Sequence, residues 1–230
     1  MNDALHQLGH RQRLRERFLG HAGEHLPDYE LLELVLFAAK PRGDVKPLAK
    51  KLLKEFGSFD QVIFADEAAL RKIEHVGDAV ITALKTVRVA SARLLKSSFA
   101  DKPIIQSWTA LLDYCALAMG RSPVEEFRVL FLNHRYALLA DEVMQRGTIN
   151  HTPVYPREII KRALELSASS MILVHNHPSG DTSPSAADIE MTKKIIVAAK
   201  AVGISVHDHV IIAEKNHFSF RSSGLMESAV

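Results

Sequence analysis

Apolar residues recur along the first hundred residues at the three- and four-residue spacing of helices that bury one face. The stretch RQRLRERFLG, residues 11–20, places Leu14 and Phe18 on one helical face and ends at a glycine. The same periodicity predicts further helices at residues 28–39, 44–56, 59–65, 67–74 and 78–95. We therefore expect an all-helical domain at residues 1–100.

The pattern changes after residues 99–103, FADKP, which break the helical periodicity and mark the expected domain boundary. A helix is predicted at 108–119, followed by two β-rich runs that Asn133-His134-Arg135 joins as a hairpin. Beyond them, helices are predicted at 156–166 and 184–202, and strands at 171–174, 206–213 and 218–220. The expected fold class is α+β in two domains, with an α/β sandwich at residues 104–230.

The most informative stretch is HNHPSGDTSPSAAD, residues 175–188. A buried strand should deliver His175 and His177 to its end, and Ser183-Pro184 should begin the next helix. Asp188 then falls about one turn inside that helix. Two imidazoles and one carboxylate form the ligand set of an open zinc site, so Zn²⁺ is the expected cofactor. In the alternative, the histidines only cap a loop and Asp188 is an ordinary first-turn residue.

Composition narrows the classes of protein and of site. Cys115 is the single cysteine, which excludes an intrachain disulfide and a thiolate metal cluster. No apolar run approaches the roughly 20 residues that cross a bilayer, and the N-terminus has no apolar signal-peptide core. We expect a cytoplasmic protein without a membrane partner. The net charge of +2 is too small to predict nucleic-acid binding by itself.

A turn at His75-Val76-Gly77 precedes the long helix predicted at 78–95. It resembles the turn of a helix-hairpin-helix, in which backbone N–H groups bind a nucleic-acid phosphate. Here His75 replaces the first glycine of that turn. The two open interpretations are a DNA-binding hairpin and a helical hairpin kept for packing.

Two family resemblances follow from the residues around the histidines. His-x-His-Pro, six residues, then Ser-x-x-Asp matches the JAMM (MPN-type) metalloprotease motif, with Asp188 eleven positions after His177. The chain also resembles the bacterial RadC family through DEVMQRGTINHTPVYPREIIKRALELSA, through DHVIIA and through the N-terminal ERFLGHAGEHLPDYELLELVL. The resemblance implies a helix-hairpin-helix-like N-terminal domain and a cytidine-deaminase-like MPN sandwich.

The JAMM resemblance also implies residue roles. His175, His177 and Asp188 would hold zinc, Ser185 would stabilise an oxyanion, and Glu142 would act as general acid and base. For Glu142 the alternative is an ordinary surface strand residue. Asn176 departs from the Ser or Thr that JAMM peptidases usually carry between the two histidines.

The predicted function is that of a zinc-dependent metallopeptidase or isopeptidase with a protein or peptide substrate. The alternative is a DNA-repair-associated protein that binds DNA through its N-terminal domain, with a metal site of another or structural role. His207, Asp208 and His209 mimic a second ligand cluster. Strand alternation turns Asp208 away from both histidines, so we expect these three residues to form hydrogen bonds rather than ligate a metal.

Overall fold

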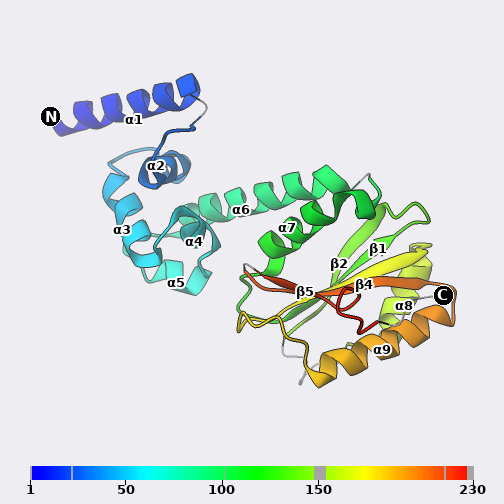
Figure 1. The fold of residues 1–230 in the computed structure, drawn as a ribbon. Helices are drawn as coiled ribbons and strands as arrows, with labels where there is room; N and C mark the ends of the chain where they lie inside the picture. The colour runs from blue at the N-terminus through cyan, green and yellow to red at the C-terminus, as the bar shows by residue number, and fades with distance from the viewer. Residues whose placement is uncertain (1, 22, 101, 148–153, 215, 227–230) are drawn as a thin grey trace. The chain divides into compact units, whose positions relative to one another are not determined.

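The computed structural model describes residues 2–21, 23–100, 102–147, 154–214 and 216–226, and separates into two compact units, Met1–Ser91 and Ala92–Val230 (Figure 1). The division lies within helix α6 (Asp78–Phe99), earlier than the break predicted at residues 99–103. The physical reason is packing, because Leu95 and Phe99 in the last turns of α6 belong to a core of the second unit.

The first unit is helical. One apolar core unites its helices, with Leu32, Leu36, Leu52 and Leu84 fully buried. The helices are α1 (Asn2–His21), α2 (Asp28–Ala39), α3 (Lys46–Phe56), α4 (Phe59–Phe64), α5 (Glu67–Arg71) and the first part of α6. The all-helical N-terminal half predicted from periodicity is confirmed.

The second unit is built on a five-stranded mixed sheet of order β2-β1-β3-β4-β5 (Figure 1). Its strands are β1 (Glu126–Leu132), β2 (Leu138–Arg146), β3 (Ser170–Asn176), β4 (Ser205–Ile212) and β5 (His217–Ser219). Strand β1 is antiparallel to β2 and β3, whereas β3 and β4 are parallel and are joined through helix α9 (Ala186–Lys200). The buried strand β3 lies at the centre.

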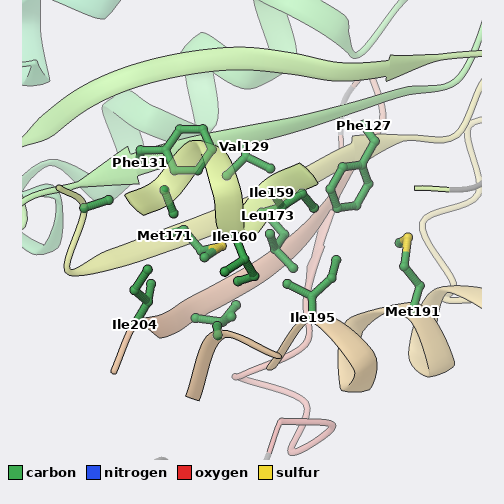
Figure 2. Close-up of a cluster of buried hydrophobic side chains, with 14 of the residues drawn as sticks. Phe127, Val129, Phe131, Ile159, Ile160, Met171, Leu173, Met191, Ile195 and Ile204 are labelled. Atoms are coloured by element: carbon green, nitrogen blue, oxygen red, sulfur yellow. The ribbon is translucent and has the colours of Figure 1, made fainter. Parts of the chain in front are cut away.

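Side-chain alternation gives the sheet two buried faces. Residues such as Val129 and Leu173 face helices α8 (Pro156–Glu165) and α9, and Figure 2 shows them gathered with Ile160 and Ile195 of those helices. The opposite face packs against helix α7 (Trp108–Met119), which follows the short 3₁₀ helix η1 (Ile104–Ser107). The α+β fold class is confirmed. None of the helices in the described ranges has the length and apolarity to cross a membrane.

The start predicted for helix α9 is wrong by two residues. Ser185, not Ser183, is the N-cap, and the helix begins at Ala186 rather than at Pro184. Ser185 and Asp188 form a capping box, which satisfies two backbone N–H groups at once.

Candidate metal centre

Three side chains predicted as ligands converge beside the carboxyl end of strand β3. His175 is fully buried on the face of α8 and α9, because it pairs with Phe127 on β1 and Ile211 on β4. His177 follows the strand, and Asp188 lies in the first turn of α9. The strand and the helix that follow each other in the chain therefore bring two imidazoles and one carboxylate together.

The distances within this trio match tetrahedral coordination of one ion. The two histidine Nε2 atoms are 3.0 Å apart, and Asp188 oxygens lie 3.4 Å from His175 Nε2 and 3.6 Å from His177 Nε2. Two ligands at the usual zinc distance of about 2.0–2.1 Å are separated by roughly 3.3 Å in a tetrahedron. These three residues are a group that could hold a metal ion, and their nitrogen and oxygen donors suit zinc.

The carboxylate of Asp188 is held from both sides. Burial alone would raise its pKa, but a protonated His175 beside it and the hydrogen bonds from Ser185 outweigh burial and lower the pKa well below the ordinary range of Asp. Ser185 donates from Oγ to Asp188 Oδ2 over 2.6 Å and from its backbone N over 2.8 Å. The structure thus shows Ser185 in contact with Asp188, and the role of Ser185 toward an oxyanion stays a prediction.

The second histidine group does not form a common site. His207 lies against Trp108 and Tyr136, with ring centroids 6.3 and 5.6 Å away. Asp208 accepts hydrogen bonds from Ser219 Oγ and Arg221 N. His209 lies on the other side of the sheet, where its Nε2 is 2.8 Å from His175 Nδ1.

Glu142, the expected general acid and base, lies on β2 on the face of α8 and α9. It shares a row with Val129 and Leu173, two strands and about 10 Å across the sheet from β3. Arg162 Nε and Nη2 bind its carboxylate at 2.6–3.0 Å. Both oxygens of Glu142 thus have a partner on α8, and its catalytic role remains a prediction.

A second acidic residue, Glu125, lies on the segment that leads into β1. Only two residues later, Phe127 of β1 pairs with His175. Glu125 immediately precedes β1, and its backbone oxygen accepts a hydrogen bond from Gly147 N. Side-chain alternation from Phe127, the partner of His175, places the Cβ of Glu125 on the same face of the sheet. The sequence motif could not single out this residue, because its position follows from the pairing of β1 with β3.

Asn176, between the two histidines, forms hydrogen bonds with the backbone of the segment that carries Glu125. Its side chain is fully buried, accepts from Glu126 N over 2.8 Å and donates to the carbonyl oxygens of Ser122 and Val124 over 3.4 and 3.2 Å. A Ser or Thr at this position is too short to span these contacts. Asn176 therefore connects the end of β3 to the segment before β1.

Asn176→Ser is expected to lower the free energy of unfolding by about 2–4 kcal/mol, because several buried polar groups lose their partner. Asn133→Ser is the matched control, since the Asn133 side chain also bonds backbone groups, accepting at Oδ1 from Arg135 N and Ala137 N, but lies in the partly exposed β1–β2 turn. Urea unfolding of both variants measures the difference. Equal losses for the two would show that Asn176 contributes no more than a turn residue.

The turn before α6 adopts the geometry that a glycine would favour. His75 has a φ of 69°, in the left-handed region that the first glycine of a helix-hairpin-helix turn would occupy without strain. Acidic groups surround the turn, since Glu74 lies 3.5 Å from His75 and Asp78 pairs with Arg71 at 2.8 Å. DNA binding through this turn stays a prediction.

Comparison with known proteins places the chain in a family. A family model described as RadC-like JAB domain matches residues 105–225. A UPF0758 protein of Rhodobacter capsulatus is 56% identical over 93% of this chain and 100% of its own length. A UPF0758 protein of Ruegeria pomeroyi is 51% identical, covering 94% of this chain and 97% of its own length. With the histidine and aspartate trio in place, these matches confirm the resemblance: the chain belongs to the RadC family, and its second unit carries the RadC-like JAB domain.

Proposed function

We propose that the chain is a JAMM-type zinc metallohydrolase that cleaves an amide bond in a protein or peptide, as a peptidase or isopeptidase. The observation that carries the proposal is the geometry of His175, His177 and Asp188, whose ligand atoms lie within 4.8 Å of one another. A zinc ion bound there would supply Lewis acidity and a nucleophilic water at neutral pH.

Side chains around the trio would orient the ligands and transfer protons during the reaction. Ser185 orients the Asp188 carboxylate through two hydrogen bonds. A glutamate must accept a proton from the attacking water and return it to the leaving amine. Glu142 is the residue that the JAMM resemblance implies. Glu125 is an alternative, because strand alternation from Phe127, the partner of His175, directs its Cβ to the same face of the sheet. We favour Glu125, because Glu142 lies two strands, about 10 Å, across the sheet from β3.

The test is metal content followed by hydrolysis. Protein purified without chelators is expected to carry about one zinc per chain, and His177→Ala almost none. The zinc-loaded protein should cleave members of a panel of peptides and isopeptide-linked lysine conjugates, and a chelator should stop the cleavage. Lys200→Ala, at the far end of α9, is the control variant and should keep both properties. Protein that neither retains zinc nor gains thermal stability from added zinc would contradict the proposal.

A further inference from the structure

A chain of short hydrogen bonds runs from the metal trio through the core and back to it. His175 Nδ1 lies 2.8 Å from His209 Nε2, and His209 Nδ1 lies 2.6 Å from Thr192 Oγ1. Thr192 Oγ1 then lies 2.6 Å from the backbone oxygen of Asp188. We call this series of hydrogen bonds, from His175 through His209 and Thr192 to Asp188, the relay. It ends at Asp188, whose carboxylate faces His175 and His177.

The direction of every hydrogen bond in the relay follows from the Asp188 carbonyl, which can only accept. Thr192 has a single hydroxyl proton and gives it to that oxygen, so His209 Nδ1 must donate to Thr192. The neutral His209 ring then has only an acceptor at Nε2, so His175 Nδ1 must donate to it. The Nε2 of a neutral His175 is left with its lone pair directed at His177 and Asp188.

His177 is held in the same Nδ1-protonated tautomer by a different hydrogen bond. Its Nδ1 lies 2.6 Å from the backbone oxygen of Asp181, which again can only accept. Its Nε2 therefore also presents a lone pair, 3.0 Å from that of His175. Two lone pairs at this distance repel unless a cation lies between them.

The structure assigns Thr192 and His209 as positioning residues that hold His175 in the Nδ1-protonated tautomer required for a metal ligand through Nε2. His209 is fixed for this task by stacking on Phe220, with ring centroids 4.5 Å apart, and by an edge contact with Phe127 at 5.8 Å. Outer partners of histidine ligands are usually carboxylates, backbone carbonyls or water, and here an imidazole takes that place. This assignment rests on the proposed metal site but not on the reaction performed there.

Thr192→Val keeps the shape of the side chain and removes both hydroxyl contacts of the relay. Zinc affinity, measured by competition with a chelating dye, is expected to fall roughly 10- to 100-fold, as for other outer partners of metal ligands. Thr192→Ser retains the hydroxyl and should restore affinity close to that of the natural protein. Thr86→Val is the matched control, because Thr86 makes the same bond to a backbone oxygen four residues earlier, over 2.8 Å, away from any histidine pair.

Long-range ¹⁵N–¹H NMR of the histidine rings in the metal-free protein tests the relay directly. His175, His177 and His209 are expected to carry their proton on Nδ1, and Thr192→Val should leave His175 a mixture of tautomers. Nε2 protonation of His209 in the natural protein, or an unchanged zinc affinity in folded Thr192→Val, would overturn the assignment. A protein with these tautomers that binds zinc yet hydrolyses nothing would contradict the proposed function and leave the relay standing.

Discussion

Asp188→Asn is expected to weaken zinc binding at least about 100-fold while the fold persists. Loss of an outer partner already costs roughly 10- to 100-fold, and Asp188 would contact the metal itself. The asparagine amide has the size of the carboxylate, and its oxygen can still accept from Ser185, whose bonds cap helix α9. Competition with a chelating dye measures the affinity, and far-UV circular dichroism measures the fold.

Thermal unfolding with and without zinc distinguishes the role of Asp188 in metal binding from its role in capping helix α9. Zinc bound only to the folded state raises its stability by RT ln(1 + [Zn]/Kd), and this gain should vanish in Asp188→Asn. Glu190→Gln is the control on the same helix, where Glu190 forms an exposed pair with Lys194 at 3.4 Å. A zinc-dependent gain that survives in Asp188→Asn would exclude Asp188 as a ligand.

Glu125→Gln is expected to slow hydrolysis roughly 100- to 10,000-fold, the usual range for loss of a general acid or base. Zinc content should stay near that of the natural protein, because Glu125 is outside the ligand trio. The rate constant is measured with whichever amide substrate the panel identifies, and zinc by elemental analysis. The same variant should retain that substrate, since binding persists while proton transfer fails.

Glu142→Gln is the matched comparison, and its effect on the rate is expected to be smaller. Its ion pair with Arg162 is partly exposed and screened by water, so the variant should lose little stability. If Glu142→Gln slows hydrolysis more than Glu125→Gln does, the role belongs to Glu142, as the JAMM resemblance implies. Equal and small effects would exclude both carboxylates as the proton carrier.

Local patterns in the sequence predicted much of the fold. The helices α2, α3 and α7 follow from apolar residues at helical spacing, and β3 follows from the run that ends at Val174. The candidate metal-binding trio was predictable for the same reason, because Asp188 lies only eleven positions after His177 in the chain. One strand, one loop and one helix start are enough to bring these side chains together.

The surroundings of the trio were decided by strand pairing and packing. His209 reaches His175 from 34 positions later in the chain because β4 pairs parallel with β3. Asn176 reaches Glu126 from 50 positions away because β1 pairs antiparallel with β3. The sequence by itself determined which residues are candidate ligands, since that depends on residue type and local spacing. Only the tertiary structure decided which groups orient those ligands, because contacts between distant strands depend on the packing of the whole sheet.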